Sequence, residues 1–246
     1  MSNIKGNQHM EKVAVILCGG LGTRLRPYTI TIPKPLMPIG DYSILEIIVK
    51  QLKEAQFDRL ILAVNYRSDL IKAFFQDGAR FGIKIEYSEE SEPLGTIAPL
   101  KNISSLPEKF MVMNGDILTN LNYGDYFSAY NPKSEFALVP TYKKVYKSEF
   151  GVLTLNNHGN LADFSEKPSQ ELFISMGVYY FSQKLFEYVP DNTPFGFDQL
   201  MLKALEGNER IKCPEHIGDW LDIGNHQDYE YAQDNWNNIS RRLFLG

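Results

Sequence analysis

The chain has 246 residues, of which 43% are hydrophobic and 22% charged, and its formal net charge at pH 7 is −5. A chain of this length and apolar content can bury a full core, and we expect one large domain rather than two small ones. The negative charge and the lack of long basic runs argue against nucleic acid as a partner.

The sequence also argues against a membrane protein and against zinc. No apolar run reaches the roughly 18 residues that a membrane span requires, and the first residues contain no apolar signal segment. We therefore expect a cytoplasmic protein that does not bind a membrane. The four histidines show no zinc-binding spacing, so a zinc site is not expected.

The stretch Val13–Ile39 is the most informative part of the chain. It opens with the apolar run Val13–Leu17, which predicts a strand buried on both faces of a parallel sheet. Glycines follow, and a glycine-rich turn lets main-chain N–H groups approach a ligand. The stretch then contains Arg24 and Lys34 but no acidic residue. A basic loop on an acidic chain is what a polyphosphate site requires.

The spacing of this loop excludes the two best-known glycine loops. A Walker A loop needs G-x-x-x-x-G-K-[ST], and no Lys follows Gly22 in that register. A dinucleotide loop needs G-x-G-x-x-G, and the third position here is Leu25. The remaining alternative is a tight turn with solvated charges, which Arg24 and the Pro-Lys-Pro at 33–35 argue against.

The sequence GGLGTRLRPYTITIPKPL, residues 19–36, resembles the signature of the sugar-1-phosphate nucleotidylyltransferases, or NDP-sugar pyrophosphorylases. Their pattern is G-x-G-T-R followed about ten residues later by K-P. The similarity is nearest to the short bacterial enzymes that resemble mannose-1-phosphate guanylyltransferase. It implies a nucleotide site that includes Leu17, Gly19, Gly20, Gly22, Thr23, Arg24 and Lys34.

Expected helices and strands alternate in the first half of the chain. Capping residues Ser43 and Ser68 each begin an expected helix, and further strands are expected over Arg59–Asn65, Ile83–Tyr87 and Phe110–Met113. This order predicts an α/β fold, with a Rossmann-like, mostly parallel sheet, helices on both faces, and ligands beyond the carboxyl ends of the strands. We expect a flexible segment over residues 1–11, then a nucleotide-binding half over 12–134.

Asp116 directly follows one of these expected strands. A carboxylate there can hold a divalent cation, and Mg²⁺ is usually bound by one or two carboxylates with phosphates and water. A turn cap is the alternative, since Asn-Gly-Asp is common turn chemistry. The resemblance implies the metal role for Asp116 and places Gly115 in the nucleotide site.

The segment Glu89–Thr96, EESEPLGT, follows another strand and resembles the family segment that shapes the base pocket. The resemblance implies that Gly95 passes close to the base and that Glu90 contacts its edge.

Beyond about residue 135, turn signals separate short strands. We expect them over Phe136–Tyr142, Phe150–Leu155, Leu161–Ser165 and Ile174–Phe181. They predict an antiparallel elaboration that forms one wall of the same cleft, with residues 135–246 as the sugar-phosphate half of a single domain over 12–246.

Three motifs in this half resemble the family: Phe150-Gly151-Val152, Glu166-Lys167-Pro168 and Met176-Gly177-Val178-Tyr179. The resemblance implies that Gly151, Glu166, Lys167 and Gly177 surround the sugar 1-phosphate. Lys167 would neutralise the attacking phosphate, and Glu166 would accept hydrogen bonds from sugar hydroxyls. An E-K-P sequence by itself is more often plain surface.

The segment 218–224, GDWLDIG, resembles the family's W-x-D-x-G and implies that Asp222 is a second metal carboxylate. Asp219 is the competitor, although its flanking glycine favours a turn. We expect one helix over His226–Leu245 with a core-packing stripe, and a homo-oligomer contact stays open. No hexapeptide period follows residue 220, so the β-helix of many relatives is not expected.

Together these patterns predict an enzyme that transfers a nucleotidyl group from a nucleoside triphosphate to a sugar 1-phosphate, with Mg²⁺. Arg24, Lys34, Asp116 and Lys167 are its expected catalytic residues. The resemblance favours GTP and a mannose-like or heptose-like sugar. There are three alternatives. The donor could be a cytidine, thymidine or uridine nucleotide with another sugar 1-phosphate, or the acceptor could be a molybdopterin or lipid phosphate. The chain could also be a non-catalytic nucleotide-sugar sensor.

Overall fold

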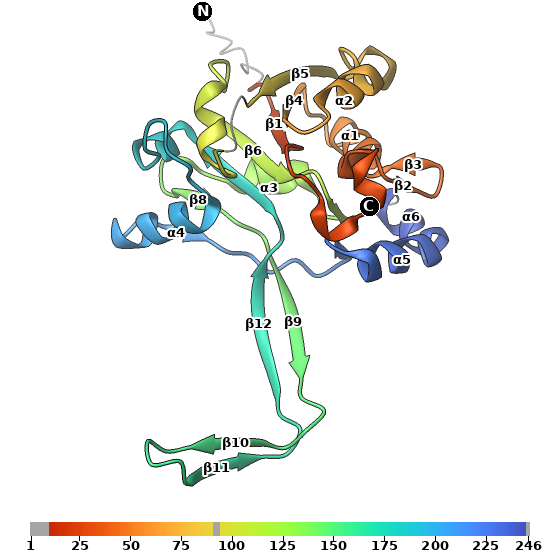
Figure 1. The fold of residues 1–246 in the computed structure, drawn as a ribbon. Helices are drawn as coiled ribbons and strands as arrows, with labels where there is room; N and C mark the ends of the chain where they lie inside the picture. The colour runs from red at the N-terminus through yellow and green to blue at the C-terminus, as the bar shows by residue number, and fades with distance from the viewer. Residues whose placement is uncertain (1–9, 91–93, 245–246) are drawn as a thin grey trace, which may run out of the picture.

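The structure is a computed structural model that describes residues 10–90 and 94–244. We call residues 141–175 the arm and the other described residues the body. A seven-stranded mixed sheet lies at the centre of the body (Figure 1). Its strand order is β14-β8-β13-β6-β1-β4-β5, with bounds β1 Val13–Leu17, β4 Arg59–Val64, β5 Lys84–Glu89, β6 Lys109–Asn114, β8 Ala137–Leu138, β13 Val178–Ser182 and β14 Ile211–Lys212.

Most neighbouring strands in this sheet are parallel. Strands β5, β4, β1 and β6 run in one direction, whereas β13 runs antiparallel to both β6 and β8. Short connections join antiparallel strands, while parallel strands need crossovers, which here include α1 and α2. The predicted Rossmann-like, mostly parallel sheet with an antiparallel elaboration is confirmed.

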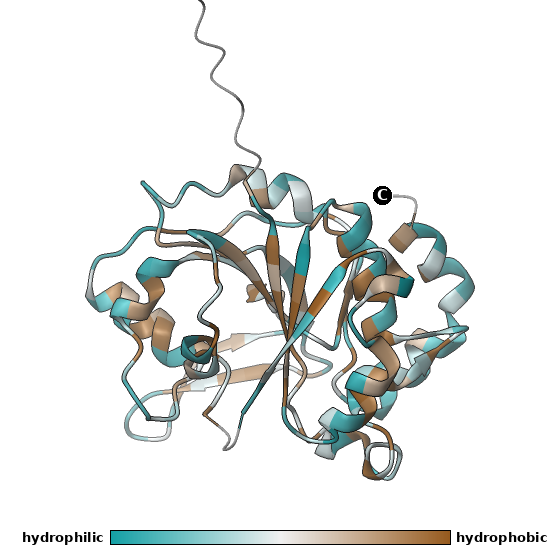
Figure 2. Ribbon diagram, turned by 90° about the horizontal axis from the view of Figure 1, so that it is seen from above, coloured by the Kyte–Doolittle hydropathy of each residue, from teal (hydrophilic) through white to brown (hydrophobic). Residues whose placement is uncertain are grey.

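Apolar side chains fill both faces of the sheet. In β1, Ala14 and Ile16 belong to one core and Val13 and Val15 to the other, because successive side chains of a strand point to opposite faces. Figure 2 shows the hydrophobic central strands between flanking helices. The first face is covered by α1 Ile44–Glu54, α2 Ser68–Phe75, α3 Tyr123–Ala129, α5 His226–Asp234 and α6 Trp236–Phe244; the other is covered by α4 Phe197–Glu206 and two short 3-10 helices.

The start of α1 follows from its sequence. The Ser43 hydroxyl accepts a hydrogen bond from the Glu46 backbone N–H at 3.2 Å, which satisfies one of the free donors at the helix start. Ile44, Leu45 and Ile48 then bury their side chains in the core. The predicted helix start at Ser43 is confirmed.

The expected strand Phe136–Tyr142 was wrong, because Val139 and Pro140 separate β8 from β9 Thr141–Lys147. Two further predicted elements are also divided in the structure. The expected helix over 226–245 is two helices, α5 and α6, which meet at Asn235, where the side chain donates back to the Tyr231 carbonyl at 2.9 Å. The expected strand Ile174–Phe181 is likewise interrupted at Gly177, whose φ is +73°. Both predictions were wrong because local backbone geometry ends an element while the apolar pattern continues.

The arm consists of four strands. β9 Thr141–Lys147 pairs antiparallel with β12 Ser169–Ser175, and β10 Val152–Leu155 pairs with β11 Leu161–Ser165 beyond them. The turn between β10 and β11 closes through a hydrogen bond from the Asn156 N–H to the Asn160 carbonyl. Figure 1 shows the ribbon of β9 and β12 projecting away from the body, with the β10–β11 hairpin at its end. The division of the domain into a nucleotide-binding half and a sugar-phosphate half therefore stays a prediction.

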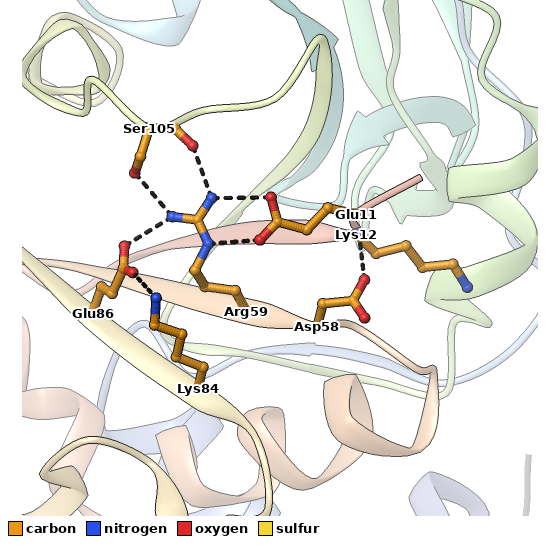
Figure 3. Close-up of polar contacts among 7 residues, drawn as sticks. All are labelled: Glu11, Lys12, Asp58, Arg59, Lys84, Glu86 and Ser105. Atoms are coloured by element: carbon orange, nitrogen blue, oxygen red, sulfur yellow. Dashed lines mark hydrogen bonds and ion pairs between the residues drawn. The ribbon is translucent and has the colours of Figure 1, made fainter. Parts of the chain in front are cut away.

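An ionic network joins the amino ends of the central strands (Figure 3). The buried Arg59 guanidinium donates to Glu11, to Glu86 at 2.8 Å, and to both the hydroxyl and the carbonyl of Ser105. Glu11 belongs to the segment 1–11 that was expected to be flexible, and residues 1–9 of that segment lie outside the described residues. Across the described ranges, no helix has the length and apolar character needed to cross a membrane.

Candidate functional site

The site lies where the strand order reverses. From β1 the chain continues to β4 and β5 on one side of the sheet and then to β6 on the other. Ligands of open α/β sheets bind in such a crevice, beyond the carboxyl ends of the strands. Leu17 at the end of β1 is paired with Asn114 at the end of β6. The glycine loop and the Gly115–Asp116 segment therefore lie side by side.

A cavity of about 450 Å³ opens at this point. Six residues predicted from the sequence line it: Leu17, Gly19, Gly20, Glu90, Gly95 and Asp116. The other lining residues are Leu21, Ala63, Asn65, Thr96 and Asn114. The structure thus brings together parts of four strand ends that are far apart in the sequence.

Asn65 and Asn114 are polar lining residues that the sequence reasoning did not assign to the site. Asn65 directly follows β4 and Asn114 is the last residue of β6, so both lie at the end of a buried apolar run, the same signal that singled out Asp116. The Asn65 side chain donates to the Glu90 carbonyl at 3.3 Å, and the Glu90 N–H donates to Val64 at 3.2 Å. These bonds hold Glu90 at the rim of the cavity.

Gly22 and Gly115 shape the site without lining the cavity. Gly22 has φ +59°, and its carbonyl accepts a hydrogen bond from the Thr29 hydroxyl at 2.8 Å. Gly115 donates its N–H to the Leu17 carbonyl at 3.0 Å, and a Cβ there would lie 2.9 Å from that same oxygen. Thr23 begins the short 3-10 helix Thr23–Leu25 that follows the glycine loop.

Two cations reach the edge of the cavity from the loop. The Lys34 ammonium group forms an ion pair with the Asp116 carboxylate, and the two side chains are only 11% and 25% exposed. The Arg24 guanidinium lies next to Gly224, 3.4 Å from the position that a Cβ would take there. None of the described residues pairs with Arg24, so its donors face the site without a partner.

Asp116 directly precedes one strand and Asp222 ends the neighbouring one. β7 Ile117–Thr119 pairs antiparallel with β15 Trp220–Asp222, so that Asp222 is opposite Ile117. The Ile223 N–H donates to the Asp116 carbonyl at 3.0 Å. Burial raises the pKa of Asp222, and the negative charge of Asp116 raises it further, while Lys34 and Arg24 oppose both effects.

This pair of carboxylates fits a divalent cation. One carboxylate oxygen of Asp116, Oδ1, is buried and has no hydrogen-bond partner among the described residues. A cation would satisfy this oxygen and relieve the repulsion between the two carboxylates. Residues 10–90 and 94–244 contain no group of three or more His, Cys, Asp or Glu that could hold a metal. Such an ion would thus take its other ligands from phosphates and water, as Mg²⁺ usually does.

The competitor Asp219 is engaged elsewhere. Its carboxylate accepts a hydrogen bond from Arg242 at 2.5 Å, and its carbonyl accepts one from the Thr119 hydroxyl at 2.7 Å. These contacts favour Asp222 as the second carboxylate, and the assignment stays a prediction.

The residues expected at the sugar phosphate are divided between body and arm. Gly177 lies in the body, where its carbonyl accepts the Asn114 N–H at 2.9 Å. Gly151, Glu166 and Lys167 lie at the outer end of the ribbon, where a Cβ on Gly151 would be 3.1 Å from a Glu166 carboxylate oxygen. The ribbon separates them from the body by roughly 20 Å, given the rise per residue of a strand. The structure does not bring them to Asp116 within one chain, and their role stays a prediction.

A second cavity, of about 390 Å³, lies at the base of the arm beside Asp222. Lys144 lines it, as do Tyr142 and Trp220, whose rings stack with centroids 5.4 Å apart. A still larger open hollow, of about 1050 Å³, lies at Asp58 and Lys84, the amino ends of β4 and β5. Because ligands of such sheets bind at the opposite edge, the cavities near Asp116 and Asp222 are the candidate site.

Comparison with known proteins gives an independent view of the chain. The model of a family described as "Nucleotidyl transferase" matches residues 13–238. The chain is 30% identical over 239 residues to UTP–glucose-1-phosphate uridylyltransferase of Synechocystis sp., covering 89% of this chain and 62% of the relative. It is 32% identical over 226 residues to mannose-1-phosphate guanyltransferase beta-A of Xenopus laevis, covering 88% and 62%. The chain thus spans a little over three fifths of these relatives.

Solved structures show the same similarity. HddC from Yersinia pseudotuberculosis matches with a TM-score of 0.71 and 28% identity, over 92% of this chain and all of that chain. The same protein complexed with GMP-PN matches with a TM-score of 0.71 and 27% identity.

Proposed function

The chain belongs to the nucleotidyl transferase family, and we propose that it transfers a nucleotidyl group from a nucleoside triphosphate to a sugar 1-phosphate. One observation carries the proposal: Lys34 pairs with Asp116 in the wall of the 450 Å³ cavity, and the charges of both, with that of Arg24, act on Asp222, which lines the 390 Å³ cavity. Joining two polyanions requires little covalent chemistry from the protein. It requires that both anions are positioned and that their mutual repulsion is neutralised.

In the proposed reaction, an oxygen of the sugar phosphate attacks the α-phosphorus of the nucleotide and forms a new P–O bond. The bond from the α-phosphorus to the oxygen that bridges to the β-phosphate breaks, and pyrophosphate leaves with the electron pair. Arg24 and Lys34 would bind the β- and γ-phosphates and stabilise the charge that develops on them. The nucleophile is already an anion, so no side chain is needed as a base.

Asp116 and Asp222 would hold Mg²⁺, which when bound neutralises phosphate charge and acts as a Lewis acid. Before substrates arrive, Lys34 and Asp116 pair with each other. A bound cation would take over Asp116 and leave Lys34 free for phosphate oxygens.

We further propose that the base is guanine. Burial raises the pKa of Glu90, whose carboxylate lies 3.6 Å from the Cβ position of Gly19 at the cavity wall. Guanine presents two adjacent N–H donors on one edge, at N1 and at the 2-amino group, and a carboxylate accepts both at once. Uracil and thymine present a single N–H there. Guanylyltransferases among the relatives and a neighbour solved with GMP-PN support this choice.

The test is a panel of substrate pairs. Pyrophosphate release would be measured with Mg²⁺ for GTP, CTP, UTP and dTTP, each with mannose, glucose and heptose 1-phosphate. We expect GTP with a mannose-like or heptose-like 1-phosphate to give the highest rate. The Asp116→Asn variant provides the background. These charged metabolites are cytoplasmic, so the proposed reaction places the chain in that compartment.

The alternative function is a sensor that binds a nucleotide sugar without turnover. The retention of Arg24, Lys34, Asp116 and Asp222 argues against it, since a sensor has no need for charges that stabilise a leaving group. Binding of GTP or GDP-mannose without pyrophosphate release from any pair would favour the sensor.

A further inference from the structure

The hairpin at the end of the arm has one apolar face that nothing in the described chain covers. Leu153 is opposite Phe164 and Leu155 is opposite Leu161 across β10 and β11, and all four side chains are more than half exposed. The other face carries the Thr154–Asp163 pair. A hairpin with one apolar and one polar face is built to pack on a core, and an isolated two-stranded hairpin is marginally stable in water.

The apolar surface extends along the whole arm. Ten of its large apolar side chains are at least 40% exposed, with Phe150 the highest at 77%. At about 150–250 Å² for a large side chain, half exposure of ten gives roughly 800 Å² of open apolar surface on one arm. These side chains lie on both faces of the arm, and their summed area is larger than the largest apolar patch of a typical monomer, which is about 300–600 Å². The arm therefore has the surface of a protein interface.

The arm cannot cover this face with its own body. Its ribbon is a regular seven-residue ladder that holds the hairpin away from the sheet (Figure 1). The residues that the sugar-phosphate motifs identify are at the same end. A Cβ on Gly151 would lie 2.7 Å from the Phe164 ring and 3.1 Å from Glu166, so the motifs and the apolar face form one unit. Within one chain, both the hairpin and the site at Asp116 are incomplete.

We propose that the arm packs on the body of a second copy of this chain and brings Glu166 and Lys167 to that copy's Asp116–Asp222 site. The role of the site rests on the proposed function, whereas the packing of the arm does not. The exchange is reciprocal and closes as a twofold dimer, because each copy offers one arm and accepts one. Two arms would bury on the order of 1,600 Å² of apolar surface, the size of a stable interface.

Charge favours a second copy as the partner. Residues 141–175 contain four Lys and four acidic residues, so the arm has no net charge, and the rest of the chain carries the full −5. A neutral arm meets an acidic body without the repulsion that two acidic bodies would have. Lys144, at the base of the arm, is the competing source of a cation for the sugar phosphate from the same chain.

The first experiment measures the oligomeric state by gel filtration with light scattering at micromolar concentration. We expect the wild type at twice the 28.2 kDa of one chain. The double variant Leu153→Asp/Phe164→Asp should be monomeric with an unchanged circular dichroism spectrum of the body. Two matched controls should stay dimeric: Thr154→Lys on the polar face of the same hairpin, and Leu205→Asp, which removes an exposed apolar side chain from α4. A monomeric wild type, or a dimer that survives the double variant, would overturn the proposal.

The second experiment asks which chain supplies Lys167. Asp116→Asn and Lys167→Ala chains would be co-expressed, purified together through two different tags, and assayed for pyrophosphate release. In a mixed dimer, the intact body of the Lys167→Ala chain receives the intact arm of the Asp116→Asn chain, which restores one of the two sites. Random assembly should return about a quarter of the wild-type kcat before purification and about half in the purified mixed dimer.

If the arm acts within its own chain, the mixed dimer has no intact site and shows only the parental background, which would overturn the shared site. Activity that is lost in Lys144→Ala but kept in Lys167→Ala would also overturn it. The two proposals fail separately. A dimer that the hairpin variant dissociates, with no pyrophosphate from any substrate pair, would contradict the proposed function and leave the arm exchange standing.

Discussion

Lys34 and Asp116 form an ion pair at the mouth of the cavity, and both are mainly shielded from water. Removing one partner of a shielded pair leaves the other charge uncompensated, so either substitution disturbs the resting site as well as the loaded one. In the proposed reaction the two groups separate, because the cation takes Asp116 and phosphates take Lys34. In the proposed reaction the pair would therefore couple metal binding to phosphate binding.

This coupling predicts non-additive kinetics. Lys34→Ala and Asp116→Asn should each lower kcat/KM by about 10²–10³, the effect of losing one preorganised electrostatic group. The double variant should lose much less than the product of the two single losses, because each single change already disables the shared arrangement. Steady-state kinetics of the four proteins would measure both effects.

Lys53→Ala is the control, because Lys53 is an exposed lysine in the last turn of α1. It should keep kcat/KM within about twofold of the wild type, as an exposed charge far from the reacting groups contributes little. Independent, multiplicative losses for Lys34 and Asp116 would contradict the coupling.

The two cysteines should differ in reactivity. Cys18 is buried at the end of β1, where burial and the nearby Asp116 charge raise the pKa of its thiol well above its usual range. Cys213 is exposed. Since the thiolate is the reactive form, a disulfide reagent should label one thiol per native chain and two in denaturant. Labelling should disappear from native Cys213→Ser, and rapid labelling of Cys18 in the native chain would contradict the buried position.

At the scale of single residues, the sequence motifs identified six residues that line the cavity. They could be identified because the site lies at the ends of buried strands, which are visible as apolar runs. Asn65 fits the same rule, but a single Asn after an apolar run resembles many ordinary turns. Gly115 lies beneath the cavity rather than in its lining, since its missing Cβ makes room for the Leu17 carbonyl. A motif indicates that a glycine is required and leaves open which atoms require it.

Two glycines of the loop that connects β1 to the first short helix, Gly20 and Gly22, should respond differently to alanine. Gly22 has φ +59°, and a Cβ there would be 2.9 Å from Thr29 Cγ2. Gly22→Ala should lower the free energy of unfolding by about 1–3 kcal/mol. Gly20 has no atom within 4 Å of its Cβ position and no positive φ, so Gly20→Ala should change it by less than about 0.5 kcal/mol. Urea unfolding of both variants is the measurement, and equal effects would contradict this loop geometry.

The Arg59 network should stabilise the amino ends of β1, β4 and β5. Arg59→Met would remove the Arg59 donor from the Ser105 carbonyl and from the Glu11 carboxylate, and it would leave Glu86 with Lys84 (Figure 3). Because both carboxylates are partly exposed, we expect a loss of about 2 kcal/mol, below the value for a fully buried pair. The matched control Lys84→Met removes only an exposed ion pair to Glu86 and should cost less than about 0.5 kcal/mol.

The same network predicts a pH dependence. Hydrogen bonds from Lys84 and then Arg59 hold the pKa of Glu86 below its ordinary value of 4.5. A lowered folded-state pKa contributes stability that is complete above the unfolded value and is lost as the pH falls through the folded value. The difference in stability between wild type and Arg59→Met should therefore narrow below pH 4.5. Urea unfolding midpoints of both proteins at pH 7 and pH 3.5 would test this. If the stability difference between them is the same at both pH values, Glu86 is not the cause of the pH dependence.

At the scale of elements, the sequence predicted the central strands well because they are continuous apolar runs between turn residues. It overlooked the break at Asn235, where the apolar stripe continues from α5 into α6 although the backbone does not. It also merged β12 with β13, since Gly177 interrupts a run of strand-forming residues. Hydrophobic periodicity reports which side chains share a face and is insensitive to a single residue that ends an element.

At the scale of the whole molecule, the sequence predicted β10 and β11, but it predicted neither the full length of β9 and β12 nor the direction in which the arm leaves the body. Alternation in β10 and β11 indicates an apolar face, and the obvious partner for such a face is the core of the same chain. The structure instead leaves that face open. Which body an arm packs on depends on the path of the chain at Tyr142 and Ile174, and period-two patterns do not encode that path.

Removing the arm should separate nucleotide binding from catalysis. Tyr142 and Ile174 are directly opposite each other in the ribbon, so a two-residue Asn-Gly turn can replace residues 143–173 and keep the stack of Tyr142 on Trp220. The side chains of this segment contribute little to either core, so the shortened chain should still fold, as a monomer without the stability that the arm exchange adds. It should bind GTP with an affinity within about threefold of the full chain, because the 450 Å³ cavity contains no arm residue. Its kcat should fall by at least about 10²-fold, since Lys167 and its neighbours are absent from every site in solution.

Calorimetry with GTP and the pyrophosphate assay would be run on the same preparation of the shortened chain. A shortened chain that keeps most of the wild-type kcat would show that the body alone neutralises the sugar phosphate. Arg24, which pairs with none of the described residues, would then be the first candidate for the cation that does so.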